Sequence, residues 1–206
     1  MTKTAIWLKK TIIERPQDTF IMSNHDVAYR FPENEKLQNC GWTRQKQRAF
    51  DAYFDKRLWD RFTIAHFEEW NGQLIAFSHA GLKDTFFPFQ KFDITHLRRI
   101  EKIAFDNGHK TDPNPLLDHW GASPLWVRWQ VLPLFEGICQ VVGHTSFQTP
   151  QIRAVAGKPE WNLCMDCAHT YYAVFKDKYA YAVDRHKGYE HLLNFTVNEP
   201  AKTKDS

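Results

Sequence analysis

The stretch 73-QLIAFSHAGL-82 decides the fold class that we expect for this chain of 206 residues. Its first six residues form a short apolar run, which is typical of a buried strand, and the polar residue His79 follows at once. Two other apolar runs, DTFIMS and ICQVV, are followed by Asn24 and, after one glycine, by His144. Strands that each stop at a polar side chain predict an α/β fold with a ligand site at one sheet edge.

The rest of the chain divides into helix-like and strand-like segments. Helices are expected at 5–14, as one or two amphipathic segments within 43–70, and at 94–105. A loop rich in Asn, Gly and Pro is expected at 106–115. Strands are expected at 18–23, 73–78 and 138–142, and in later segments that begin near 151, 161, 170, 179 and 192. This order favours a mixed sheet joined to a more antiparallel one.

Composition narrows the function classes. Lys plus Arg number 27 and Asp plus Glu number 24, so a net charge of +3 gives little support for nucleic-acid binding. No apolar run approaches the roughly 18 residues of a membrane span, and the N-terminus lacks the layout of a secretion signal. The four cysteines favour reduced thiols. We expect one cytoplasmic domain over 1–198 and a flexible tail at 199–206.

The strand-end residues Asn24, His79 and His144 suit a metal site. Imidazole suits zinc, iron and manganese, and an amide oxygen suits harder ions, so together they fit one first-row divalent ion. Gly81 and Gly143 would let the backbone approach a ligand closely. The alternative is that each side chain only caps or packs at its strand end, which is the ordinary role for any single one of the ten histidines.

Five short motifs follow one another along the chain: SNHD (23–26), SHAGL (78–82), PLWVR (124–128), VVGHT (141–145) and LCMDCA (163–168). Their order and separations resemble the calcineurin-like metallophosphoesterases, and most closely the compact bacterial and phage serine/threonine phosphoprotein phosphatases. The resemblance covers about residues 5–185. Ser23 stands where the family usually has Gly, and Cys167 and Ala168 stand where it has Thr and Gly.

The resemblance implies a sandwich of two mixed β-sheets with flanking helices and a metal site at the strand ends. It implies that Asn24, His79 and His144 ligate one divalent ion, Mn, Fe or Zn. His25 would be the general acid, and Arg128 would clamp phosphate with its planar fork. The implied substrate is a phosphoprotein or a small phosphate ester. For Arg128, an ordinary surface position is the open alternative.

Two motifs of that family, Asp-x-His and Gly-Asp-x-x-Asp-Arg-Gly, have no counterpart in this sequence. In the family they precede the Asn-His motif and supply the second metal's ligands and the shared carboxylate. Residues 2–15 resemble the helix after the second motif, so the chain looks like an N-terminally truncated member. Asp26 cannot be assumed to replace the lost carboxylates. The resemblance therefore implies at most one bound ion and slow hydrolysis by the lone chain.

Two function classes stay open. The first is a metal-dependent phosphoesterase, a hydrolase that needs the missing motifs from a longer chain or a partner polypeptide. The second is a non-catalytic binding or scaffold module derived from the same fold. Losing the opening strands would leave an exposed sheet edge, which predicts a partner chain or self-association.

Other candidate residues favour structural roles. Cys164 and Cys167 have the spacing of a zinc or redox pair, but no second pair accompanies them, so buried thiols are expected. His66 is expected on an amphipathic helix, packed or partly exposed. His186 and His191 are expected beside a surface turn.

Overall fold

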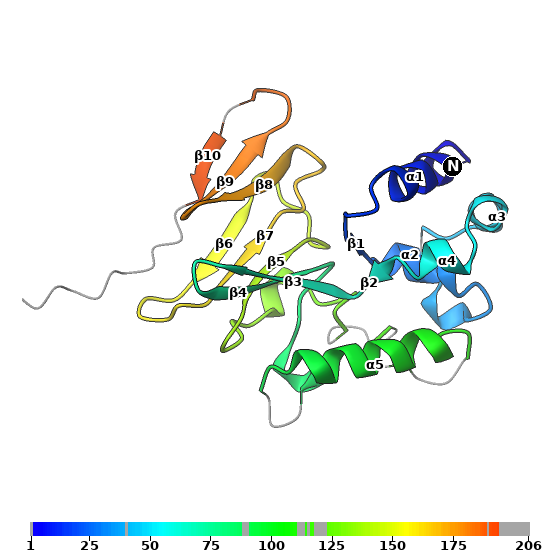
Figure 1. Cartoon of the computed structure of the whole chain (residues 1–206), viewed down its shortest axis with the longest axis horizontal. Helices are drawn as coiled ribbons and strands as arrows, with labels where there is room; N and C mark the ends of the chain where they lie inside the picture. Colours follow the sequence, from blue (N-terminus) through cyan, green and yellow to red (C-terminus); the bar gives the residue numbers. More distant parts are fainter. Residues whose placement is uncertain are drawn as a thin grey trace, which may run out of the picture.

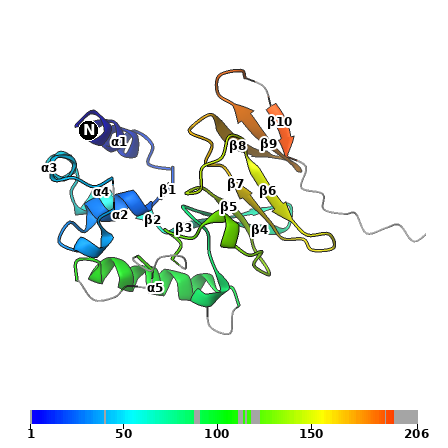
Figure 2. The same ribbon diagram turned by 180° about the vertical axis from the view of Figure 1, so that it is seen from behind.

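Helices occupy much of the first half of the chain and strands most of the second half in the computed structural model. It describes residues 2–39, 41–87, 91–110, 114, 116–117, 123–188 and 190–193. The α-helices are α1 (Thr2–Glu14), α2 (Asn24–Arg30), α3 (Arg44–Tyr53), α4 (Lys56–Trp59) and α5 (Ile94–Asn107). The strands are β1 (Phe20–Ile21), β2 (Phe62–Thr63), β3 (Ala65–Trp70), β4 (Gln73–Ser78), β5 (Cys139–Val142), β6 (Gln151–Ala154), β7 (Trp161–Cys164), β8 (Tyr171–Lys176), β9 (Tyr179–Asp184) and β10 (Glu190–Leu193). Figures 1 and 2 show α1 to α4 gathered at one end of the molecule and the two larger sheets at the other.

The largest sheet has five strands in the order β3-β4-β5-β7-β6. Its central strands β4, β5 and β7 are parallel, whereas β3 and β6 are antiparallel to their neighbours. A second sheet is antiparallel, in the order β10-β9-β8, and β1 pairs in parallel with β2. Because β4, β5 and β7 run in the same direction, their C-terminal ends lie at one edge of the sheet.

The five-stranded sheet is covered on both faces. Ile75 of β4 and Trp161 of β7 share a buried cluster with Ala180 and Ala182 of β9, so the three-stranded sheet covers one face. Ala76, the next residue on β4, points to the opposite face because side chains alternate along a strand. It belongs to a larger cluster that includes residues of the helices.

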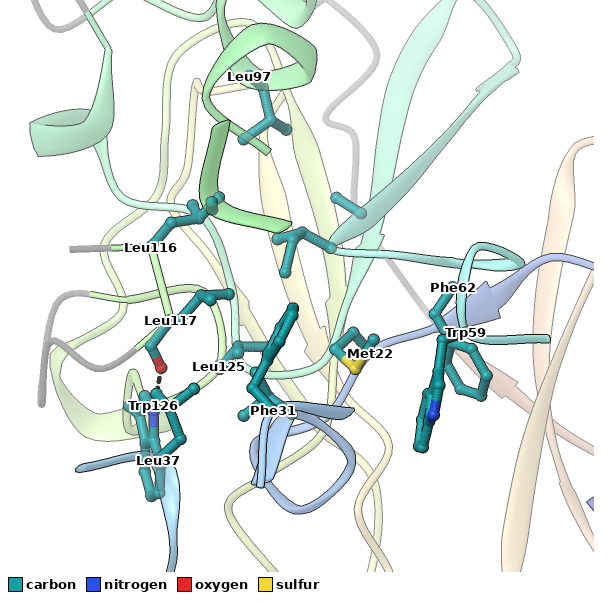
Figure 3. Close-up of a cluster of buried hydrophobic side chains, with 14 of the residues drawn as sticks. Met22, Phe31, Leu37, Trp59, Phe62, Leu97, Leu116, Leu117, Leu125 and Trp126 are labelled. Carbon is teal, nitrogen blue, oxygen red and sulfur yellow. Dashed lines mark hydrogen bonds between the residues drawn. The ribbon is translucent and has the colours of Figure 1, made fainter. Parts of the chain in front are cut away.

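That larger cluster joins the helical end of the molecule to the sheet. Met22, just after β1, lies with Phe31 and Trp59 in this cluster, together with Leu97 of α5 (Figure 3). Trp126 is anchored within it by its indole Nε1, which donates to the backbone oxygen of Leu117 over 2.8 Å. The β1–α2 segment is thereby packed against the same core as the sheet.

The expected α/β class is confirmed, with mixed and antiparallel sheets and a few helices. The sequence predicted two mixed sheets. Among the described strands, only the five-stranded sheet is mixed, and the three-stranded sheet is antiparallel. The strand predicted at 73–78 and the helix predicted at 94–105 correspond to β4 and α5.

The predicted helices within 43–70 are wrong for the last part of that segment. After α3 and α4 the chain forms β2 and β3, so His66 lies on a strand and not on a helix. The reason is a hairpin: β3 pairs with β4 across Asn71 and Gly72, whose φ angles are 52° and 71°. An Asn-Gly pair with positive φ angles is the preferred tight turn between antiparallel strands.

Some predicted segments fall partly or wholly outside the described residues. These are residues 111–113 and 115 of the predicted loop, residues 194–198 of the last predicted strand, and the tail at 199–206. Among the helices that the structure describes, none has both the length and the apolar character needed to cross a membrane.

Candidate metal centre

His79 lies at the C-terminal edge of the five-stranded sheet, directly after β4. Its Nε2 atom is 2.9 Å from Oδ1 of Asn24 and 3.1 Å from Nδ1 of His144. Three distant chain segments thus bring one oxygen and two nitrogens to one place. The three residues that the sequence suggested as metal ligands, here called the donor set, lie together.

Asn24 reaches this place as the first residue of α2, and a capping box fixes its helix. Asp26 N donates to Ser23 Oγ over 3.1 Å, and the Asp26 carboxylate accepts from Ser23 N over 3.0 Å. Burial raises the pKa of Asp26, while its bonds to Ser23 and the charge of His25 oppose the rise. Asn39 Nδ2 holds the backbone oxygen of Asn24 at 2.8 Å. The Asp26 carboxylate is therefore engaged by the helix cap.

His144 reaches the donor set through a tight turn after β5. Thr145 N donates to Gly143 O over 2.8 Å, and His144 between them has a φ of 65°. A three-residue turn with positive φ at its centre is rare and strained for a residue other than glycine. Gly143 N donates to His79 O over 2.8 Å, which joins the two histidine loops. Strain of this kind is a signature of functional sites.

Both imidazoles of the donor set are held neutral at neutral pH. Burial lowers the pKa of His79 to about 3, and the nearby charges of His144 and His25 add to the effect. Burial also lowers the pKa of His144 to about 4, with the charge of Arg128 adding and that of Asp166 opposing. A neutral imidazole keeps a lone pair on one ring nitrogen, which is the form that binds a metal.

The two distances within the donor set are hydrogen-bond lengths, and they are also compatible with two edges of an octahedral metal site. Metal–ligand bonds of about 2.1 Å set at right angles place neighbouring donor atoms about 3.0 Å apart. The two distances from His79 Nε2, 2.9 Å and 3.1 Å, agree with that spacing. With Nδ1 of His144 facing His79, its other ring nitrogen, Nε2, is buried and has no hydrogen-bond partner in the described part of the chain.

The donor set contains no carboxylate. Within the residues that the structure describes, no group of three or more His, Cys, Asp or Glu side chains is placed to hold a metal ion. The donor set has two such residues and completes its three donors with the Asn24 amide. The positive charge of a bound ion would therefore not be balanced by a ligand of this set.

His25 and Arg128 lie beside the donor set and are exposed. The charge of His25 acts on both His79 and His144. Its ring lies against the backbone at Gly41, where an added Cβ would be 2.8 Å from the ring atoms Cε1 and Nδ1. Arg128 Nη1 donates to the backbone oxygen of His144 over 3.3 Å. Both side chains are within reach of a ligand that enters from solvent.

Two residues at this edge, Asn39 and Asp166, were not among the site residues predicted from sequence. Asn39 holds the backbone of Asn24, and Asp166 follows β7 at the position where His144 follows β5. Asp166 could have been found from sequence, because its distance past the strand end equals that of His144. Asn39 offers no comparable signal, because its contact with Asn24 depends on how the loop after α2 folds back.

The remaining candidates have structural positions. Cys164 and Cys167 are buried free thiols, and burial raises the pKa of each, that of Cys167 to about 11. On β3, His66 Nε2 lies 2.6 Å from a carboxylate oxygen of Glu68. His186 is exposed, and the side chain of His191 lies outside the described residues.

A cavity of about 780 Å³ lies away from the donor set, between α2, α4 and α5. Its cationic side chains are already engaged by acidic partners. These pairs are Arg30–Asp60, Lys56–Asp60, Arg98–Glu101 and Lys102–Asp106. The cavity therefore offers little uncompensated charge to an ionic ligand.

The geometry at the sheet edge is the evidence for a functional site. No family model, curated protein or solved structure matches the chain in comparisons with known proteins.

Proposed function

We propose that this chain binds one divalent metal ion through Asn24, His79 and His144 and belongs to the phosphoesterase class of hydrolases. The observation that carries the proposal is the meeting of three donor atoms at the C-terminal edge of the sheet, 2.9 Å and 3.1 Å apart. Two neutral imidazoles and an amide oxygen suit manganese, iron or zinc.

The exposed residues beside the donor set supply the other functions that phosphate hydrolysis needs. A bound divalent ion provides Lewis-acid polarisation of a phosphate oxygen. Arg128 binds the remaining phosphate oxygens, because its planar guanidinium can donate two parallel hydrogen bonds. A water molecule attacks phosphorus in line, and as the ester P–O bond breaks, protonated His25 donates a proton to the leaving oxygen as the general acid. The substrate is a phosphoprotein or a small phosphate ester.

The arrangement of the sheets supports the same proposal. A mixed sheet with an antiparallel sheet on one face and helices at the other is compatible with the two-sheet sandwich of the calcineurin-like metallophosphoesterases. The donor set follows β1, β4 and β5, and strand ends are where ligands collect in α/β folds. The fold and the site thus favour one function class.

The lack of a carboxylate in the donor set determines the activity that we expect. Residues 1–206 alone should hold one ion at most and hydrolyse phosphate esters slowly, because two-ion clamping is a main source of rate in this chemistry. A polypeptide segment that adds carboxylates would raise the rate. The β1–β2 pair is a place for it to bind, since neither strand has a second neighbour among the described strands.

The lack of a carboxylate in the donor set also favours a second candidate function, a non-catalytic module. Such a module would use the metal and Arg128 to hold a phosphorylated partner without hydrolysing it. The two candidates share the metal centre and differ in whether His25 takes part in turnover.

Calorimetric titration with Mn²⁺ tests the metal centre. The wild-type chain should bind one ion, and His79→Ala should weaken binding beyond the roughly 10- to 100-fold loss typical of outer-shell changes. His66→Ala is the matched control, because His66 lies on the neighbouring strand and is engaged by Glu68. No Mn²⁺ uptake by the wild type, or equal uptake by His79→Ala, would refute the proposed centre.

Hydrolysis of p-nitrophenyl phosphate in Mn²⁺ separates the two candidates. Turnover should rise when a segment bearing Asp-x-His and Gly-Asp-x-x-Asp-Arg-Gly is supplied, and His25→Ala should remove it while Mn²⁺ binding persists. Binding of Mn²⁺ without turnover in either form would select the non-catalytic module.

A further inference from the structure

Matching positions on adjacent strands bring Asp166 to the same sheet edge as the donor set. In the register of the sheet, Val142 of β5 pairs with Cys164 of β7. Two residues further along each strand stand His144 and Asp166. Met165 N donates to Val142 O over 2.8 Å, so the segments that follow β5 and β7 remain hydrogen-bonded beyond the ends of the two strands.

Asp166 also occupies a three-residue turn, of opposite hand to that of His144, because its φ angle is not positive. Cys167 N donates to Met165 O over 2.9 Å, which makes Asp166 the central residue of a three-residue turn. The two turns touch: a Cβ added to Gly143 would lie 3.9 Å from Cβ of Asp166. The end of β7 therefore supports the loop that carries His144.

Two hydrogen bonds tie Asp166 to the residues that follow His144. Ser146 Oγ donates to Asp166 Oδ2 over 3.0 Å, and Phe147 N donates to the Asp166 backbone oxygen over 2.8 Å. Thr145, between His144 and Ser146, is held from the other side, because its Oγ1 accepts from Trp129 N over 3.0 Å. The strained turn at His144 is thus held by bonds on both sides.

We propose that Asp166 is a positioning residue of the metal centre, an inference that rests on the proposed function. Through Ser146, its carboxylate holds the His144 turn in the conformation that directs Nδ1 at the donor set. Its negative charge lies next to a set of ligands that has none. A carboxylate beside a bound cation raises the affinity of the site without being a ligand, because opposite charges attract at partly buried positions.

Metal titration with paired variants tests the two roles of Asp166. Asp166→Asn keeps an acceptor for Ser146 and removes the charge, so Mn²⁺ affinity should fall about ten-fold, as for other outer-shell residues. Ser146→Ala keeps the charge and removes the tether, and should also weaken binding. Ser146→Thr restores a hydroxyl and should restore affinity, which a general loss of stability would not explain.

Asp177→Asn is the matched control, because it removes the same charge from another turn of the chain. Asp177 lies in the β8–β9 turn, where its backbone oxygen accepts from Asn71 over 3.2 Å. Asn71 precedes β4, whereas His79 follows it, so this turn lies at the other end of the strand. Asp177→Asn should leave Mn²⁺ affinity unchanged.

A measurement without metal keeps this inference separate from the proposed function. Amide exchange of Thr145 N–H, followed by NMR, reports the turn at His144 directly. It should accelerate in Ser146→Ala and remain at the wild-type rate in Asp177→Asn. If the wild type takes up no Mn²⁺, the proposed function fails, and the exchange rates still decide whether Asp166 and Ser146 hold the turn. If the wild type binds Mn²⁺ but Asp166→Asn binds it equally and Thr145 exchange is unchanged in Ser146→Ala, the role of Asp166 is refuted alone.

Discussion

The two ends of the five-stranded sheet make tight turns with different residues. At the N-terminal end of β4, positive φ angles fall on Asn71 and Gly72, which adopt them at little cost. At the C-terminal end of β5 and β7, they fall on His144, Ala168 and His169. A left-handed conformation costs an ordinary residue about 1–2 kcal/mol. Asp177, in the turn beside Asn71, also has a positive φ of 52°, which aspartate, like asparagine, adopts more readily than other residues. The strained positions of other residue types are therefore found at the end that carries the donor set.

This difference separates a structural end of the sheet from the end for which we propose a function, here called the functional end. The Asn71–Gly72 turn needs only to reverse the chain, and its residues are suited to that task. The turn at His144 needs a particular side chain at a position where glycine or asparagine would be more stable. Retained strain of this kind is a reason to look for a ligand, and three donor atoms meet beside it.

The largest expected effect on stability comes from replacing a glycine by alanine at each end of β4. Gly81 has a φ of 119°, and a Cβ there would lie 2.5 Å from Cδ1 of the buried Leu132. Gly81→Ala should therefore lower the free energy of unfolding by about 3 kcal/mol, from backbone strain and overpacking together. At Gly72 a Cβ meets nothing within 4 Å, so Gly72→Ala should cost about 1 kcal/mol. Urea denaturation measures both, and equal costs would show that the two ends are equally tolerant.

A smaller effect of opposite sign is expected at His144. Asparagine tolerates positive φ, and His144→Asn removes a buried ring nitrogen that has no partner among the described residues. The free energy of unfolding should stay level or rise by about 1 kcal/mol, while Mn²⁺ binding is lost. The reverse change, Asn71→His, should cost roughly 1 kcal/mol and leave Mn²⁺ binding intact. A clear loss of stability in His144→Asn would mean that the turn is not strained.

The sequence alone predicted part of the fold. It failed where pairing between strands determines the secondary structure. β4 was predictable because an apolar run between a turn and a polar residue has few other solutions. β3 was mistaken for helix because Glu68 and Glu69, which point to opposite faces and are both exposed, interrupt its alternation, as an edge strand tolerates. The Asn71–Gly72 pair was the local signal that could have corrected the error.

For the candidate site, the sequence indicated which residues lie close together. It did not indicate the backbone conformation that orients them. Asn24, His79 and His144 could be grouped because the ends of parallel strands share an edge. The turn that orients His144 could not be foreseen, since no local pattern places a histidine at positive φ. The contacts of Asp166 with the His144 loop could not be foreseen either, because they follow from the register of β5 and β7, which depends on long-range pairing.

The smallest expected effect is the loss of Mn²⁺ affinity when a buried thiol is removed. It can be measured by comparing two buried thiols at opposite ends of the sheet. Cys164 Sγ lies 3.4 Å from Thr145 O and 3.7 Å from Gly143 O, on either side of His144, whereas Cys139 Sγ lies 3.7 Å from Pro159 O. Cys164→Ala and Cys139→Ala should each cost about 1 kcal/mol of unfolding free energy in urea, because each removes one buried sulfur atom.

Only Cys164→Ala should also weaken Mn²⁺ binding in calorimetric titration, by about three-fold, because a weak S–H···O contact is worth roughly 0.6 kcal/mol. Equal Mn²⁺ affinity in the two variants would show that the hydrogen bonds of Ser146 and Thr145 hold the His144 turn without help from the thiol. A loss in Cys139→Ala as large as that in Cys164→Ala would be more serious, because Cys139 is at the beginning of β5. Metal affinity would then follow the stability of the whole sheet, and the functional end would not be separable from the structural one.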